Sequence, residues 1–249
     1  MGGTGNARFA GRRVAVSGAG GGIGRAVARR FAAEGAALVL IDCDAAALAE
    51  CRAEAGGQAV TVLCDQTRPE EVERAVAEAG GVDVFVNNAG VILRKPLLDT
   101  RPEELERVMA VNATGCMAMA IGMARAMGAR GGGGVIVNVS SQLAFMGAAE
   151  RGVYGASKAA LVQFTRTAGV EWIGQGIRVV GVAPGPVESP MTAALQADAA
   201  QFAAFVARSP IGRMIRADEI AEIVAFLASP MAATIVGQTI IADGGWSLT

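Results

Sequence analysis

Short apolar runs alternate with helix-like segments along this 249-residue chain, and the alternation constrains its fold more than any other feature. The runs are apolar at successive positions, not at every second one, which is typical of parallel strands covered on both faces. Strands joined by helices in this way form an α/β fold with a doubly wound parallel sheet and right-handed crossovers. We expect about seven strands, at 13–17, 37–42, 59–64, 83–86, 135–140, 177–182 and 239–241, flanked by helices at 23–34, 45–55, 69–79, 103–129, 152–174 and 217–228.

The sequence predicts one domain over residues 1–249, because no long polar linker and no internal repeat divides it. The segment near 188–210 departs from the regular alternation, since it lies between a strand and a helix and carries Phe202 and Phe205 on one helical face. Ligands of open α/β sheets bind beyond the carboxyl ends of strands, so we interpret this insertion as a substrate lid. A packed surface helix is the alternative.

The composition argues against several classes of partner. The net charge is −1, so charge gives no reason to expect nucleic acid or an anionic membrane surface. The uncharged stretches 108–124 and 223–242 are interrupted by polar residues, glycine or proline, and the N-terminal residues lack the apolar core of a signal peptide. We therefore expect a cytoplasmic protein that does not cross a membrane. The chain has no histidine and its four cysteines form no C-x-x-C pair, so we expect reduced thiols and no metal site.

A glycine-rich turn follows the first expected strand and opens the first expected helix. It runs from Ser17 to Gly24 and includes Gly18, Gly22 and Ile23. Glycines let the backbone approach a pyrophosphate, which the free N–H groups and the dipole of the helix N-terminus then stabilise. In this strand–turn–helix context, the turn predicts a dinucleotide site.

Asp42 ends the second expected strand, 24 residues after Gly18. A carboxylate at this place accepts hydrogen bonds from the adenosine ribose hydroxyls and repels a 2′-phosphate. No arginine or lysine follows Asp42 directly or lies inside the glycine turn, which favours NAD over NADP as the cofactor. The alternative is that Asp42 only caps a helix, a role that Asp44 could equally fill.

The ends of the third and fourth strands supply further cofactor candidates. Asp65, followed by Gln66, could hydrogen-bond the adenine amino group or merely cap the next helix. Asn88, Ala89 and Gly90 bring an amide and a glycine to the carboxyl edge of the sheet, where a plain turn is the alternative.

Tyr154 is the only tyrosine of the chain, and Lys158, four residues later, is one of only two lysines. Without histidine, proton transfer near pH 7 must use another side chain. A tyrosine ordinarily has a pKa of about 10, so it needs a neighbouring cation to act as a base, and an ammonium one helical turn away is such a neighbour. The pair therefore predicts a general acid/base built on Tyr154.

Together these motifs resemble the short-chain dehydrogenase/reductase superfamily over almost the whole chain. The glycine turn resembles its TGxxxGIG motif with serine in place of threonine, Asn87 to Gly90 resembles its NNAG segment, and Tyr154 to Lys158 resembles its YxxxK motif. The other matches are Asn112 and Ser141 of the catalytic tetrad, the nicotinamide-loop residues Pro184, Gly185, Val187 and Ser189, and the C-terminal Asp243-Gly244-Gly245. The resemblance implies a single Rossmann-type NAD(P)-binding domain and a homotetramer packed through the helices at 103–129 and 152–174.

By this resemblance the protein is an NAD-dependent oxidoreductase that interconverts a secondary alcohol and a ketone by hydride transfer. Tyr154 exchanges the proton of the reacting oxygen, while Lys158 lowers the pKa of that tyrosine and holds the nicotinamide ribose. Ser141 donates a hydrogen bond to the reacting oxygen, and Asn112 fixes a water that relays the proton.

The small-molecule substrate is less closely defined. Candidate contacts are Arg94, Gln142, Leu143 and Met191. An arginine at position 94 resembles the sugar-acid branch of the family, where it meets a carboxylate, and an exposed loop pair with Lys95 is the alternative. We expect a sugar, a sugar acid or a small or cyclic secondary alcohol. Two other functions remain open: an NADPH-dependent 3-oxoacyl thioester reductase, and a non-catalytic dinucleotide-binding protein.

Overall fold

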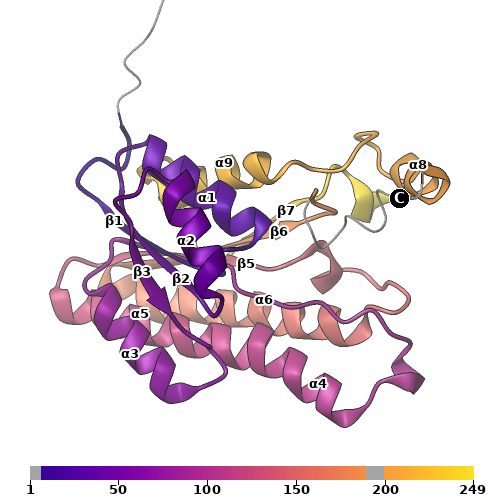
Figure 1. Cartoon of the computed structure of the whole chain (residues 1–249), viewed down its shortest axis with the longest axis horizontal. Coiled ribbons are helices and arrows are strands. Elements are labelled where there is room, and N and C mark those ends of the chain that lie inside the picture. The colour runs from indigo at the N-terminus through magenta and orange to yellow at the C-terminus, as the bar shows by residue number, and fades with distance from the viewer. Residues whose placement is uncertain (1–6, 189–198) are drawn as a thin grey trace, which may run out of the picture.

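A seven-stranded parallel sheet forms the centre of the computed structural model, which describes residues 7–188 and 199–249. The strand order is β3-β2-β1-β4-β5-β6-β7, so the chain builds one half of the sheet from the middle and then returns to build the other (Figure 1). The strands are β1 (Arg13–Ser17), β2 (Ala37–Asp42), β3 (Val60–Leu63), β4 (Val84–Asn87), β5 (Gly134–Val139), β6 (Ile177–Pro184) and β7 (Thr239–Ala242). This confirms the doubly wound architecture predicted from the sequence, which places a crevice at the carboxyl ends of β1 and β4.

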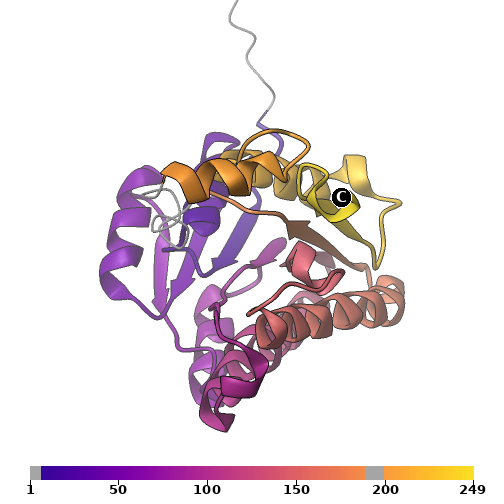
Figure 2. The same cartoon turned by 90° about the vertical axis from the view of Figure 1, so that its right-hand side faces the viewer.

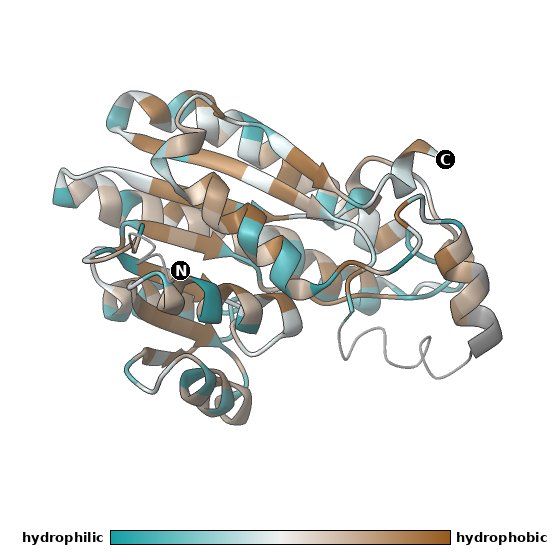
Figure 3. Cartoon of the chain, turned by 90° about the horizontal axis from the view of Figure 1, so that it is seen from above, coloured by the Kyte–Doolittle hydropathy of each residue, from teal (hydrophilic) through white to brown (hydrophobic). Residues whose placement is uncertain are grey.

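The predicted strand bounds are correct for β1 and β2 and differ by one or two residues elsewhere. β3 is one residue shorter at each end, β4 and β5 are each shifted by one residue, and β6 and β7 extend further at their carboxyl ends. All four residues of β4 and all eight of β6 are buried, which explains their continuous apolar pattern. Coloured by hydropathy, the strands are mostly brown and the helices around them carry teal positions (Figure 3).

Helices cover the two faces of the sheet in separate layers (Figures 1 and 2). One face carries α1 (Gly22–Ala33), α2 (Ala45–Glu54) and α9 (Ala217–Ala228), and the other carries α3 (Pro69–Ala79), α5 (Cys116–Arg130) and α6 (Gly152–Trp172). Phe31 of α1 lies in the core of the first face, and Met123 of α5 lies with Phe85 in the core of the second. Two apolar cores, one on each side, therefore hold the sheet.

The helix predicted over 103–129 is not one continuous α-helix. It consists of α4 (Pro102–Met109), a π-helical turn at Ala110–Gly115 and α5. Such turns often mark functional sites, and this one carries Asn112. Gly115 lets the turn pack on the segment after β3, since a Cβ on Gly115 would lie 2.6 Å from the carbonyl oxygen of Gln66. Periodicity did not show the turn, because apolar residues occupy most faces of this stretch.

The combined helical stretch Pro102–Arg130 is long and apolar enough to cross a membrane by length and composition alone. In the fold, 50% of its most apolar part is buried, and Met119, Met123 and Met127 pack in the core beside the sheet. The core helix of a soluble protein passes the same test, so the stretch is weak evidence of a membrane span.

A row of buried polar side chains crosses the sheet near its carboxyl edge. Ser17, Asn87 and Asn138 are register partners on β1, β4 and β5. Ser17 Oγ lies 3.5 Å from Asn87 Oδ1, and Asn87 Nδ2 donates to Asn138 Oδ1 at 3.0 Å. Asn138 Nδ2 then donates to Thr165 Oγ1 of α6 at 2.9 Å. Because buried polar groups are costly without partners, this row favours a single register of three strands and α6.

The predicted lid lies only partly within the described residues. The helix α8 (Ala199–Ala207) belongs to it, and the ring of Phe205 packs on that of Trp246 with centroids 4.6 Å apart. The predicted contacts Ser189 and Met191 lie outside the described residues.

Replacing Phe31 by alanine should lower the free energy of unfolding by about 3–5 kcal/mol, because the change opens a cavity in a packed core. Phe31 is 0% exposed and meets Phe9 edge-on, with ring centroids 4.7 Å apart. Urea denaturation measures the loss. Leu98→Ala is the control, since Leu98 is 100% exposed and its loss should stay within about 0.5 kcal/mol. Equal losses for the two variants would contradict the assignment of Phe31 to the core.

Candidate active site

An open cleft of about 1340 Å³ follows the carboxyl edge of the sheet. Its walls come from the glycine turn, from the segments after β2, β3, β4, β5 and β6, from the start of α6 and from residues near α8. The predicted site residues that line it are Ser17, Gly18, Gly22, Ile23, Asp42, Asp65, Gln66, Asn88, Ala89, Gly90, Arg94, Ser141, Gln142, Leu143, Tyr154, Lys158, Pro184, Gly185 and Val187. Gly24 and Asn112 are buried and do not line the cleft.

The glycine turn approaches its neighbours more closely than side chains would allow. Gly18 has a φ of +62°, and a Cβ there would lie 2.6 Å from Ala89 Cα. A Cβ on Gly24 would lie 2.0 Å from the carbonyl oxygen of Gly18, so the first turn of α1 packs directly on the loop. No side chain caps the start of α1, where Gly22 and Ile23 line the cleft. This cradle of backbone and free N–H groups fits a dinucleotide pyrophosphate.

Ser17 and Asn88 join the glycine turn to the segment after β4. Ser17 Oγ accepts hydrogen bonds from the backbone N–H groups of Asn88 at 3.1 Å and Ala89 at 3.3 Å. Asn88 Nδ2 donates back to the carbonyl oxygen of Gly18 at 3.0 Å. The two loops at the centre of the cleft are thus cross-linked by reciprocal hydrogen bonds.

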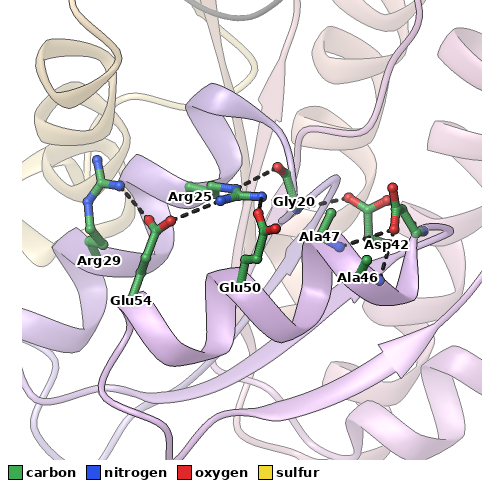
Figure 4. Close-up of polar contacts among 9 residues, drawn as sticks. Gly20, Arg25, Arg29, Asp42, Ala46, Ala47, Glu50 and Glu54 are labelled. Atoms are coloured by element: carbon green, nitrogen blue, oxygen red, sulfur yellow. Dashed lines mark hydrogen bonds and ion pairs between the residues drawn. The ribbon is translucent and has the colours of Figure 1, made fainter.

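Asp42 lies beside the glycine turn (Figure 4). Its Oδ2 accepts from the backbone N–H of Gly20 at 2.9 Å, and its Oδ1 accepts from that of Asp44 at 3.1 Å. Asp44, not Asp42, caps α2, because its side chain accepts from the N–H groups of Ala46 and Ala47. The carboxylate of Asp42 therefore lies at the cleft wall without a helix-capping role.

Arg25 follows the glycine turn in sequence, and carboxylates engage its guanidinium (Figure 4). Its Nε donates to the carbonyl oxygen of Gly20 at 2.8 Å, and its two terminal nitrogens pair with Glu50 at 2.6 Å and Glu54 at 2.9 Å. These contacts offset the charge that a 2′-phosphate would require. The sequence analysis did not consider this arginine.

The segment after β3 is folded on itself. Asp65 Oδ1 accepts from the backbone N–H and the hydroxyl of Thr67, at 2.9 and 2.8 Å. Gln66 Nε2 donates to the carbonyl oxygen of Val111 at 2.7 Å, so its amide is committed to the π turn. Asp65 is the exposed one of the two residues, and it retains acceptor capacity at Oδ2.

Lys158 is 3% exposed and donates from Nζ to the carbonyl oxygen of Val139 at 3.0 Å. Within the described ranges, no carboxylate forms an ion pair with it. Gly90 leaves room for the ammonium, since a Cβ there would lie 3.1 Å from Lys158 Nζ and 3.3 Å from Asn112 Oδ1. A buried ammonium without a counter-ion favours an anionic group that develops beside it.

Asn112 joins the π turn to the helix that carries Tyr154. Its Oδ1 accepts from the backbone N–H of Val91 at 2.8 Å, and its Nδ2 donates to Val91 O at 2.8 Å and to Ser157 Oγ at 3.0 Å. Ser157 Oγ donates in turn to the carbonyl oxygen of Tyr154 at 2.7 Å. Asn112 thus contacts Tyr154 through Ser157, a buried residue that the sequence analysis did not single out.

Tyr154 and Ser141 line the cleft from α6 and from the end of β5. Gly155 lets these two segments pack together, because a Cβ there would lie 2.7 Å from the carbonyl oxygen of Leu143. Ser141 Oγ accepts from the backbone N–H of Leu143 at 3.2 Å, which leaves its hydroxyl hydrogen available to a ligand. The geometry therefore offers one phenol and one hydroxyl donor in the same cleft.

Gln142 places a buried acceptor at the loop after β6. The residue is 5% exposed, and its Oε1 has no hydrogen-bond partner among the residues that the structure describes. A Cβ on Gly185 would lie 3.0 Å from this oxygen. A buried acceptor of this kind is suited to a ligand donor, because leaving it unpaired is costly.

The segment that carries Arg94 is anchored on both sides. Lys95 N donates to the carbonyl oxygen of Glu150 at 3.0 Å, and Lys95 Nζ pairs with Glu104 at 2.8 Å. The hydrogen bond from Lys95, followed by that from the backbone N–H of Arg101, lowers the pKa of Glu104 to about 2. Arg94 itself is exposed and lines the cleft.

The family model for enoyl-(acyl carrier protein) reductases, adh_short_C2, matches residues 18–247. Its match covers almost the whole sheet and every element of the cleft. The chain belongs to the short-chain dehydrogenase/reductase family.

Three relatives and two solved structures resemble the chain over nearly its whole length. Cis-4-hydroxycyclohexanecarboxylate dehydrogenase of Sinomonas cyclohexanicum is 42% identical, covering 96% of this chain and 98% of the relative. Sorbitol dehydrogenase of Cereibacter sphaeroides is 36% identical, with 96% and 98% covered. An uncharacterized short-chain type dehydrogenase/reductase of Sinorhizobium fredii is 39% identical over 95% of this chain, which spans only 44% of that protein.

The solved structures agree with the fold. A short-chain type dehydrogenase/reductase from Mycobacterium marinum is 32% identical with a TM-score of 0.92, covering 98% of each chain. A dehydrogenase structure from Agrobacterium tumefaciens with bound NADP is 33% identical with a TM-score of 0.90, covering 99% of this chain and 100% of the other.

Replacing Glu104 by glutamine should destabilise the protein at pH 7 and cease to matter in acid. The pKa of Glu104 in the folded state, about 2, lies below the ordinary value, so its contribution is present above about pH 4.3 and is lost as the pH falls through 2. The difference in urea midpoint between wild type and Glu104→Gln should therefore shrink steadily from pH 5 towards pH 3. Glu103→Gln, at the exposed neighbour, is the control. A difference that does not change with pH would exclude the pairing with Lys95.

Proposed function

We propose that the protein is an NAD(H)-dependent dehydrogenase that interconverts a secondary alcohol and a ketone, with Tyr154 as general acid/base. The observation that carries the proposal is the juxtaposition, in one cleft, of a phenol, a hydroxyl donor and a buried ammonium beside a glycine cradle. These are the parts that a hydroxyl-to-carbonyl reaction requires: a group that moves the proton, a donor to the reacting oxygen and a cofactor site.

Residues of the glycine turn and of the strand ends would hold the dinucleotide. The backbone at Gly22 and Ile23 would bind the pyrophosphate, Asp42 the adenosine ribose, and Lys158 the nicotinamide ribose. Asp65, Asn88, Ala89, Gly90 and the loop at Pro184, Gly185 and Val187 would border the rings. When bound, the nicotinamide supplies the site that accepts or gives the hydride.

The chain's own residues would move the proton. Tyr154 takes the proton of the substrate hydroxyl in oxidation and returns it in reduction. Lys158 stabilises the phenolate, because its ammonium is buried and has only a carbonyl oxygen as partner. Ser141 donates its free hydrogen to the reacting oxygen. Asn112 is a positioning residue here, since it reaches Tyr154 through Ser157.

NAD is proposed over NADP on two contacts. Asp42 presents a carboxylate where a 2′-phosphate would lie, and Arg25 is held by Glu50 and Glu54. A bound NADP occurs in a solved relative, so the preference belongs to the residues of this chain and not to the family as a whole. The same two contacts disfavour an NADPH-dependent 3-oxoacyl thioester reductase, the function closest to the description of the family model.

The names of the relatives support a sugar, sugar acid or cyclic secondary alcohol as substrate. The homotetramer and the cytoplasmic location expected from the sequence stay predictions, as does the lid.

Tyr154→Phe should reduce NAD reduction with a cyclic secondary alcohol by at least about 100-fold, because it removes the group that transfers the proton. Binding of NADH, followed by its fluorescence, is the control and should change less than about threefold, since the phenol contributes little to holding the dinucleotide. Equal turnover by wild type and variant would leave only a dinucleotide-binding protein without this chemistry.

Asp42→Ala should lower the preference for NAD over NADP, measured as the ratio of kcat/KM values, by about tenfold or more, because it removes the charge that repels the 2′-phosphate. Asp44→Ala is the matched control: it removes a neighbouring carboxylate that caps α2, so it should lower stability by about 1 kcal/mol and leave the ratio unchanged. Wild type that uses NADP better than NAD would contradict the role given to Asp42.

A further inference from the structure

The charged residues that line the cleft are segregated by sign. Its carboxylates, Asp42, Asp44 and Asp65, follow the ends of β2 and β3. The cations that line it within the described residues come from other elements: Arg94, Arg107, Arg151, Lys158 and Arg208. The part of the cleft beyond the cofactor cradle is thus bordered by positive charge without a lining carboxylate, which attracts an anion.

Two of these arginines are brought together by a backbone contact. Lys95 N donates to the carbonyl oxygen of Glu150 at 3.0 Å, which joins the segment of Arg94 to the residue preceding Arg151. Arg151 Nη1 donates to the same oxygen at 3.3 Å. Burial first, and then the charge of Arg94, lower the pKa of Arg151, so the two guanidiniums lie within electrostatic reach of one another.

The acidic neighbour of the pair does not remove the excess of positive charge. Glu150 pairs with Arg151 at 3.7 Å, and the side chain of Glu150 is 56% exposed against 24% for that of Arg151. A solvated pair at this distance contributes little. Two guanidiniums beside one exposed carboxylate therefore retain a net positive charge, which a bound anion would offset.

Arg151 also has a defined relation to the proposed acid/base. It is the residue immediately before α6 and stands three positions before Tyr154, so both side chains come from the first turn of the same helix and both line the cleft. An anion held at Arg151 would lie in the same cleft as the phenol.

We propose that Arg94 and Arg151 form a subsite for a carboxylate, so that the preferred substrates are hydroxy acids and keto acids. The guanidinium forks supply paired N–H donors that match a carboxylate, and the reacting carbon of the same molecule reaches Tyr154. The proposal rests on the function proposed above and adds the chemical class of the substrate and the residues that recognise it.

The test compares two ligands of the same shape that differ in charge. Isothermal titration of the full chain, with and without NAD, measures the Kd of cyclohexanecarboxylate and of cyclohexanecarboxamide. Wild type should bind the carboxylate at least about tenfold more tightly than the amide, as charge-assisted hydrogen bonds imply. In Arg94→Gln/Arg151→Gln this advantage should disappear, through weaker carboxylate binding, while the Kd of the amide stays within about threefold.

Two further variants separate recognition from general damage. Arg52→Gln removes an exposed arginine of α2 that does not line the cleft and should behave as wild type. Arg94→Lys/Arg151→Lys keeps the charge but not the forks and should retain an intermediate preference. If the double glutamine variant does not fold by circular dichroism, Arg94→Gln alone, in an exposed loop, should still weaken carboxylate binding and leave amide binding unchanged.

A wild type that does not distinguish the two ligands, or glutamine variants that lose both equally, would overturn the carboxylate subsite. Turnover is measured separately, as NAD reduction with cis-4-hydroxycyclohexanecarboxylate and with cyclohexanol. If neither is oxidised while the binding preference follows the arginines, the carboxylate subsite stands and the proposed dehydrogenase activity on these alcohols fails. If both are oxidised equally well by wild type and by the double glutamine variant, the activity stands and the subsite fails.

Discussion

The buried row of Ser17, Asn87 and Asn138 is the constraint on which the site depends. These side chains are no more than 1% exposed, and they lie side by side at the carboxyl ends of three neighbouring strands. A slip of one residue in any strand would point its polar group to the opposite face and leave its partners buried without hydrogen bonds. The row thereby fixes where β1 and β4 end, and the two loops that follow them form the centre of the cleft.

Small residues then let the functional groups approach one another. Gly18 and Gly24 bring the glycine turn onto its neighbours, Gly90 leaves room for the ammonium of Lys158, and Gly155 lets α6 pack on the turn after Ser141. In each case a Cβ would meet its neighbour at 3.1 Å or less. The site is held by backbone packing around an enclosed polar network, which favours one fixed arrangement of its donors.

Much of this could be predicted from local sequence patterns. Continuous apolar runs identified all seven strands, because strands of a sheet covered on both faces need apolar side chains at every position. The glycine turn and the pair of Tyr154 and Lys158 were found because their partners lie within a few residues of each other. The π turn that carries Asn112 was missed, since an apolar stretch of alanine and methionine looks the same with or without it.

The contacts that the sequence did not reveal join segments far apart in the chain. Ser157 could not be recognised as the link between Asn112 and Tyr154, nor Arg151 as the neighbour of Arg94, until the strand order placed α4, α6 and the segment after β4 together. The sequence by itself determined the order of strands and helices and the types of chemical group available, because periodicity and turn chemistry act over a few residues. Only the tertiary structure decided which of those groups share the cleft and where its charges gather, because parallel strands are paired through long crossovers that no local pattern records.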